Sequence, residues 1–168
     1  MTGGVWIRLE NMTDRTAIHE INEQAFGRTE EAGLVEQLRS DGDLVLSLVA
    51  EEATLVGHIA FSRLALAGQP AARIVALGPI AVLPEWQQRG VGRALIQDGL
   101  ARLKKAQEQV VLVLGDSEYY RQFGFSADQA RGFETPYDGP YLHALLLAES
   151  GDSLSGRISY PRAFAGLT

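Results

Sequence analysis

A short polar loop with two closely spaced glycines is the part of this chain whose residue types best suit binding chemistry. Gly90 and Gly92 follow an apolar, strand-like segment and open an amphipathic, helix-like one. The N-terminus of a helix presents unpaired backbone N–H groups and the positive end of the helix dipole, which suits a phosphate. Glycine lets the backbone approach an anion closely, and Arg89 and Arg93 add positive charge. The sequence therefore predicts an anion-binding loop.

Two other glycine-rich motifs fit this loop less well. Gly90 and Gly92 match the first two glycines of the dinucleotide motif G-x-G-x-x-G, but Leu95 stands at the third position. Residues 84–89 also separate the glycines from the strand, whereas that motif sits in the strand-to-helix turn. A P-loop needs a lysine after its last glycine, where this chain has Arg93. A P-loop is therefore excluded, a nicotinamide-dependent oxidoreductase is a distant alternative, and a tight turn without a ligand stays open.

A second segment, residues 115–125, also has residues of interest. Gly115 and Ser117 resemble the start of the hydrolase nucleophile elbow, but that motif needs a glycine where Tyr119 stands. No histidine is apparent as a partner for a serine nucleophile. We instead expect a short helix capped by Asp116 or Ser117, with Ser117 preferred.

The rest of the chain predicts the elements that position both segments. Gly78 and Pro79 interrupt a long strand, and because proline lacks the N–H donor, we expect a bulge there. Gly57 predicts a bend or bulge in another strand, and Gly99 allows a helix to pack closely on the sheet. Residues 126–140 are expected to be a loop. Helices are expected at residues 13–26, from 29 onward, at 90–107 and briefly after 116, and strands at 5–10, 44–51, 54–66, 72–83, 110–114, 141–148 and 156–160.

Composition places the chain among ordinary globular proteins. Its 168 residues are 46% hydrophobic and 21% charged, which suits one domain spanning residues 1–168. The net charge of −6 argues against a nucleic-acid partner. No apolar run suits a membrane span or a signal peptide, so we expect no membrane partner and a cytoplasmic location. The chain has no cysteine and its three histidines lie far apart, so neither a cysteine nucleophile nor a metal site is expected.

Two runs of residues in these segments resemble known signatures. Gln87-Gln88-Arg89-Gly90-Val91-Gly92 is similar to Q/R-x-x-G-x-G/A, and Tyr120-Arg121-Gln122-Phe123-Gly124-Phe125 is similar to Y-x-x-x-G-F. Both are signatures of the GNAT superfamily of N-acetyltransferases, and residues 25–28 and 48–51 resemble its small bacterial branch of predicted acetyltransferases. The order of the expected elements resembles this family throughout. The resemblance implies an α+β (α/β three-layer) fold with a mixed, mostly antiparallel sheet, splayed at the cofactor site and flanked by helices.

The resemblance also implies acetyl-coenzyme A as cosubstrate and direct transfer of its acetyl group to an amine. Tyr120 would donate a proton to the departing thiolate, with Tyr119 as the alternative acid. Backbone groups of three strand residues would bind the pantetheine arm, one of them polarising the thioester carbonyl, and the glycine loop would cradle the pyrophosphate. The cofactor-binding candidates are Ile80, Ala81, Val82, Gln87, Gln88, Arg89, Gly90, Val91, Gly92, Arg93 and Ser117.

The base that deprotonates the amine is left unassigned. Family members often carry a carboxylate on the bulged strand, but residues 77–79 of this chain contain none. Glu31, Glu134 and Asp138 are candidates because their segments are expected to border the substrate. The alternative to an enzyme is a non-catalytic module that binds acyl-coenzyme A as a sensor. The acceptor, a small-molecule or protein amine, stays open, and an exposed terminal strand allows a homodimer.

Overall fold

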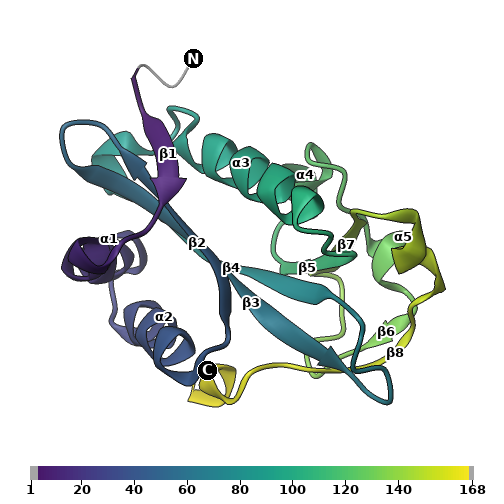
Figure 1. Cartoon of the computed structure of the whole chain (residues 1–168). Coiled ribbons are helices and arrows are strands. Elements are labelled where there is room, and N and C mark those ends of the chain that lie inside the picture. Colours follow the sequence, from purple (N-terminus) through teal and green to yellow (C-terminus); the bar gives the residue numbers. More distant parts are fainter. Residues whose placement is uncertain (1–3, 167–168) are drawn as a thin grey trace.

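The computed structural model describes residues 4–166, whose strands form an eight-stranded mixed sheet (Figure 1). The strands are β1 (Trp6–Leu9), β2 (Leu44–Glu51), β3 (Leu55–Leu66), β4 (Ile74–Val82), β5 (Val110–Leu114), β6 (Phe133–Glu134), β7 (Leu142–Leu146) and β8 (Gly156–Ser159). Six of them lie in the order β1-β2-β3-β4-β5-β7, while β8 pairs with both β3 and β6. Neighbours are antiparallel except in the pairs β4–β5 and β6–β8. The expected mixed, mostly antiparallel sheet is confirmed.

Helices cover both faces of this sheet (Figure 1). The α-helices are α1 (Arg15–Phe26), α2 (Glu30–Asp41), α3 (Val91–Lys105), α4 (Ser117–Arg121) and α5 (Ala127–Ala130), and the 3₁₀ helices are η1 (Met12–Asp14), η2 (Pro84–Trp86), η3 (Glu149–Ser153) and η4 (Arg162–Gly166). Figure 1 shows α1 and α2 on one side of the strands and α3 on the other. Within residues 4–166, every helix is too short or too polar to cross a bilayer.

The alternation of side chains along β2 explains this layered arrangement. Successive side chains of a strand point to opposite faces. Leu48 belongs to the apolar cluster that contains Leu95 of α3, whereas its neighbour Val49 packs with Ile18 of α1 and Val35 of α2. One strand therefore binds helices on both sides, and the predicted three-layer fold is confirmed.

Glycines end the two N-terminal helices, and acidic residues begin the second. Gly27 (φ 69°) follows α1 and Gly42 (φ 79°) follows α2, both in the left-handed conformation that favours glycine at a helix C-terminus. Glu30 and Glu31 occupy the first turn of α2, where carboxylates stabilise the positive end of the helix dipole. The start of α2 thus places Glu31 in the first turn of this helix.

Strands β4 and β5 pair over only part of their length. The parallel register runs from Ile74 to Leu77 on β4 and ends there, while β4 continues to Val82 beside β3. The register between β3 and β4 shifts by one residue at Gly78 and Pro79, so β4 carries the expected bulge there. Gly78 has a φ of 142°, a conformation that favours glycine. The two strands therefore splay beyond Leu77, as the family resemblance implied.

Two local expectations were wrong. Ser117 does not cap α4: the Asp116 carboxylate accepts a hydrogen bond from the Glu118 N–H at 3.0 Å, and Ser117 is the first helical residue. Residues 126–140 are not one loop, because they contain α5 and β6. Ser126 caps α5, and β6 gains its hydrogen bonds from the distant strand β8. A four-residue helix and a two-residue strand contain too few residues for a hydrophobic periodicity to be recognised in the sequence.

A buried polar network joins α1 and α2 to the sheet. His58 of β3 is fully buried, with Nε2 2.9 Å from Ser47 Oγ and Nδ1 3.3 Å from Asn22 Nδ2. The Ser47 hydroxyl donates to the Glu10 carboxylate, which Arg39 of α2 binds at 2.8 Å. Since Ser47 donates to Glu10, it accepts from His58, so this imidazole is neutral and protonated on Nε2. The helices are thus held in place by hydrogen bonds as well as by apolar packing.

The predicted close approach of α3 to the sheet at Gly99 leads to a test by substitution. A Cβ at Gly99 would lie 2.6 Å from Cε1 of the fully buried Phe61. Overpacking of this kind costs about 1–3 kcal/mol, more than the ~1 kcal/mol that alanine gains over glycine in a helix. We expect Gly99→Ala to lower the free energy of unfolding in urea. The matched change Gly33→Ala, at an exposed position of α2 with open space around it, should raise it, and stabilisation by both changes would contradict this packing.

The buried imidazole predicts a pH dependence of stability. Burial lowers the pKa of His58 to about 4 from its ordinary 6.5. The unfolded chain therefore takes up a proton as pH falls below 6.5 while the folded protein does not, so stability falls with pH. We expect His58 to account for a loss of about 2 kcal/mol between about pH 7 and about pH 5.

Urea unfolding at both pH values would measure this loss, and His58→Gln should flatten it whatever its effect on absolute stability. Burial opposes ionisation of Glu10, but hydrogen bonds from Arg39 and Ser47 outweigh it and lower its pKa, which keeps its titration below this range. An equal pH slope in the two proteins would show that His58 is not the titrating group.

Candidate active site

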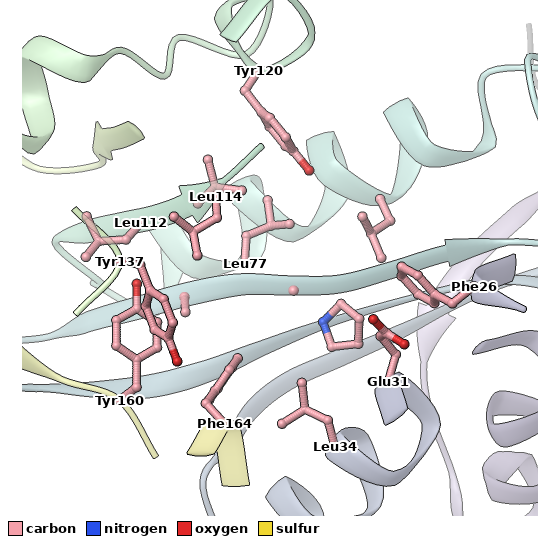
Figure 2. Close-up of a pocket in the computed structure, with 15 residues that line it drawn as sticks. Phe26, Glu31, Leu34, Leu77, Leu112, Leu114, Tyr120, Tyr137, Tyr160 and Phe164 are labelled. Carbon is pink, nitrogen blue, oxygen red and sulfur yellow. The ribbon is translucent and has the colours of Figure 1, made fainter. Parts of the chain in front are cut away.

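A cavity of about 340 Å³ lies where β4 and β5 separate (Figure 2). Residues 76–80 of β4 and 112–114 of β5 form its walls. Tyr120 of α4 closes one side, and Phe26, Glu31 and Leu34 of the two N-terminal helices close another. Tyr137, Tyr160 and Phe164, from the C-terminal third of the chain, complete the lining. This volume is sufficient for a small molecule or the reactive end of a larger one.

Tyr120 is held rigidly at this cavity. Its side chain is only 8% exposed, and Figure 2 shows its hydroxyl pointing toward the strands. The rings of Tyr119 and Phe125 contact it edge-on, with centroids 5.1 and 5.7 Å away. Gly115 leaves it room, since a Cβ there would lie 2.5 Å from the Tyr120 ring. Burial raises the pKa of Tyr120 to about 12, so this hydroxyl keeps its proton at physiological pH and can donate it.

Tyr119, the alternative acid, faces the glycine loop and not the cavity. It is 38% exposed and does not line the cavity. Its hydroxyl lies 3.3 Å from the position that a Cβ of Gly92 would occupy, so it reaches the glycine loop. Burial raises its pKa, and the charge of Arg93 opposes that shift. The structure therefore places Tyr120, and not Tyr119, beside the splayed strands.

The glycine loop opens α3 as predicted. Gly90 precedes the helix with a φ of 84°, and Val91 buries its side chain in the core while its backbone begins the first turn. Gln87 ties the loop to β4, because its side-chain amide donates to the Val82 carbonyl at 3.0 Å. The Arg89 guanidinium stacks over Trp86 at 4.9 Å and stays exposed. The loop thus presents backbone N–H groups and positive charge to solvent.

The open edge of β4 offers further donors. The Leu83 N–H donates to the Val56 carbonyl of β3 at 2.9 Å, which fixes the direction of the N–H groups along this strand. Because these groups alternate between the two edges, the N–H of Ala81 also points to β3. The N–H groups of Ile80 and Val82 point to the opposite edge of β4, which is no longer paired with β5 beyond Leu77. Two of the three predicted strand residues therefore present donors at the splay.

The three candidate carboxylates are not equivalent. Glu31 is 5% exposed and lines the cavity, with both its oxygens bound by the Arg28 guanidinium. Glu134 is exposed, and Asp138 accepts a hydrogen bond from the Thr135 N–H at 3.1 Å; neither lines the cavity. Among residues 4–166, no three His, Asp or Glu side chains are grouped to hold a metal ion.

The predicted site residues and the cavity lining do not fully coincide. Ser117, a predicted binding residue, is exposed and does not line the cavity. Conversely, several lining residues have no counterpart in the sequence predictions. The aromatic side chains Tyr137, Tyr160 and Phe164 do line it, yet they belong to no motif. Their aromatic residue types, at separated positions, were their only sequence signal.

Comparison with known proteins decides the family. A family model described as an acetyltransferase (GNAT) domain matches residues 43–127, which include both the glycine loop and Tyr120. The chain belongs to the GNAT superfamily. A GNAT relative, the uncharacterized N-acetyltransferase YjhQ of Escherichia coli K12, is 37% identical over 140 residues, covering 80% of this chain and 77% of YjhQ. The resemblance stated from the two motifs is confirmed, and the protein is an acyltransferase enzyme.

Solved GNAT structures share the whole fold. The E. coli GNAT N-acetyltransferase YhbS, in complex with CoA, superposes with a TM-score of 0.90 at 29% identity and covers 96% of this chain and 92% of its own. A GNAT acetyltransferase from Brucella melitensis, in complex with acetyl-CoA, has a TM-score of 0.82 at 36% identity and covers 95% and 97%.

Proposed function

We propose that this GNAT enzyme transfers the acetyl group of acetyl-CoA directly to an amine in the cavity between β4 and β5. The observation that carries this proposal is the splay itself, where Ile80, with its backbone donor, and the buried Tyr120 line one cavity and the N–H of Val82 lies further along the same open edge of β4. The YhbS and Brucella structures, which hold CoA and acetyl-CoA, support the choice of cosubstrate. Since the chain contains no cysteine, no cysteine acyl-enzyme can form, which favours direct transfer.

The glycine loop would hold the pyrophosphate of acetyl-CoA. Gly90 and Gly92 let the phosphates approach the N–H groups of the first turn of α3, and the helix dipole favours their negative charge. Arg89 and Arg93 would add charge, and Gln87 would position the loop through its bond to β4. Gln88 and Val91 would contribute backbone groups.

The edge of β4 would orient the thioester. The N–H groups of Ile80 and Val82 would bind the pantetheine arm and the acetyl carbonyl. In the addition step negative charge develops on the carbonyl oxygen, and preorganised donors in a site shielded from water stabilise it strongly. Ala81, whose N–H pairs with β3, would not take part through that group.

Tyr120 would act as the acid. Attack by the amine forms the C–N bond, and collapse of the adduct breaks the C–S bond and leaves a thiolate. Tyr120 keeps its proton until that step because burial raises its pKa to about 12. A positioned acid of this kind typically contributes ~10²–10⁴-fold to the rate. A proton donor at this place favours an enzyme over an acyl-CoA sensor.

Other expectations about this enzyme stay predictions. They are one domain over residues 1–168, a cytoplasmic location and a homodimer.

A substitution in the glycine loop tests the cofactor site. A Cβ at Gly92 would meet only the flexible end of Tyr119 closely, at 3.3 Å. The fold should therefore tolerate Gly92→Val, while the added side chain blocks the approach of the pyrophosphate. Losing charge-assisted hydrogen bonds to an anion should weaken acetyl-CoA binding by at least about tenfold in calorimetry. NAD, the control ligand, should not bind, and a folded wild-type protein that fails to bind acetyl-CoA would refute the site.

A matched pair of tyrosine substitutions tests the acid. We expect Tyr120→Phe to lower kcat by ~10²–10⁴-fold with any acceptor, because the thiolate loses its proton donor. The dissociation constant of acetyl-CoA should stay nearly unchanged. Tyr119→Phe is the control and should leave kcat close to that of the wild type. If the two variants behave alike in steady-state assays, Tyr120 has no special role.

A further inference from the structure

One wall of the cavity is built from aromatic rings that the transfer chemistry itself does not require. We call Tyr137, Tyr160 and Phe164 the aromatic wall. The Tyr137 and Tyr160 ring centroids lie 4.8 Å apart at 86°, and those of Tyr160 and Phe164 lie 5.4 Å apart at 75°. Edge-to-face rings of this kind present a stiff apolar surface. Phe26 and Leu34 extend that surface from the N-terminal helices.

Glu31 is the one acidic side chain among the described residues that line the cavity. Arg28 donates to both of its oxygens, with Nε 2.9 Å from Oε1, so this buried side chain has a cationic partner on one side. A carboxylate has about four lone-pair sites, of which Arg28 uses two. The rest are available to a cation in the cavity.

Glu31 and Tyr120 approach the splay from opposite sides. Figure 2 shows Tyr120 above the strands, with Glu31, Leu34 and Phe164 below them. An acetyl group held at the edge of β4 would therefore lie between the acid and the carboxylate. An amine that enters along the aromatic wall meets Glu31 on the side away from Tyr120.

We infer that the acceptor is a primary amine attached to an aromatic or bulky apolar body, and that Glu31 binds its ammonium group and takes its proton. This inference rests on the proposed function. The body would pack on the aromatic wall, where burial of apolar surface favours binding. A polyamine finds one carboxylate in this lining, so its further charges would lose water without a second anionic partner.

The proton balance of the reaction is complete with these groups. The ammonium gives its first proton to Glu31, which passes it to solvent, and the free amine attacks the thioester carbon. The nitrogen of the adduct loses its second proton as the C–S bond breaks. Tyr120 protonates the thiolate, and that second proton restores its hydroxyl. The products are the amide, the thiol of CoA and one proton.

The experiment measures release of the CoA thiol with 2-phenylethylamine and with spermidine as acceptors. We expect kcat/KM to be at least about tenfold higher for 2-phenylethylamine, since discrimination of this size follows from burying one apolar group. Glu31→Gln should lower that value by about a hundredfold, as loss of a general base does. Phe164→Ala should raise KM for 2-phenylethylamine roughly tenfold and leave kcat less affected.

Two controls separate this inference from the function on which it rests. Glu30→Gln changes the neighbouring glutamate, whose carboxylate lies 4.0 Å from Arg28 outside the cavity, and should leave all rates unchanged. Calorimetry should show the same acetyl-CoA affinity in every variant. An enzyme that binds acetyl-CoA but prefers spermidine, ignores 2-phenylethylamine or tolerates Glu31→Gln would overturn the inference alone. Failure to bind acetyl-CoA would overturn the proposed function.

Discussion

The site depends on the end of hydrogen bonding between β4 and β5 at Leu77. Gly78 and Pro79 form a bulge that keeps β4 paired with β3, while β5 stops soon after the two strands part. A strand edge inside a protein leaves donors that cost free energy unless something accepts from them. In this enzyme the edge faces a cavity, so a bound thioester can supply the missing acceptors. One local interruption of the sheet thus produces both the cavity and the unpaired donors that we propose for the cosubstrate.

The properties of Tyr120 follow from packing more than from its own helix. A helix of five residues such as α4 is too short to be stable alone. Its position comes from the aromatic contacts of Tyr120 with Tyr119 and Phe125 and from the space at Gly115. The same burial that orients the hydroxyl raises its pKa. The placement and the raised pKa of Tyr120 therefore have one physical cause, and a change that loosens this cluster alters both together.

The sequence predicted the parts of the site that depend on neighbouring residues. The glycine loop, the bulge at Gly78 and the segment with Tyr120 are each contiguous, so residue type and local order indicate them. The aromatic wall joins residues from separate C-terminal segments, and only the pairing of β8 with β3 and β6 brings those segments to the cavity. Hydrophobic period cannot reveal such pairing in a two-residue strand. The prediction of the α4 cap was wrong for another reason. Asp116 and Ser117 are adjacent and both are good capping residues, so the backbone geometry decides between them.

The two sides of the cavity are also stabilised by different forces. Hydrogen bonds from the buried His58 network hold α1 and α2, which carry Glu31. Among its described residues, the C-terminal segment has one ion pair to α2, Arg162 to Asp41 at 2.9 Å, but the Arg162 side chain is 81% exposed and such pairs contribute little. That segment is held by the pairing of β8 with β3 and β6, by the buried Ile158 and by the edge-to-face rings of the aromatic wall. Because the surface that we propose for the acceptor also contributes to this packing, a polar substitution in the wall would weaken the edge of the fold as well as the proposed acceptor site.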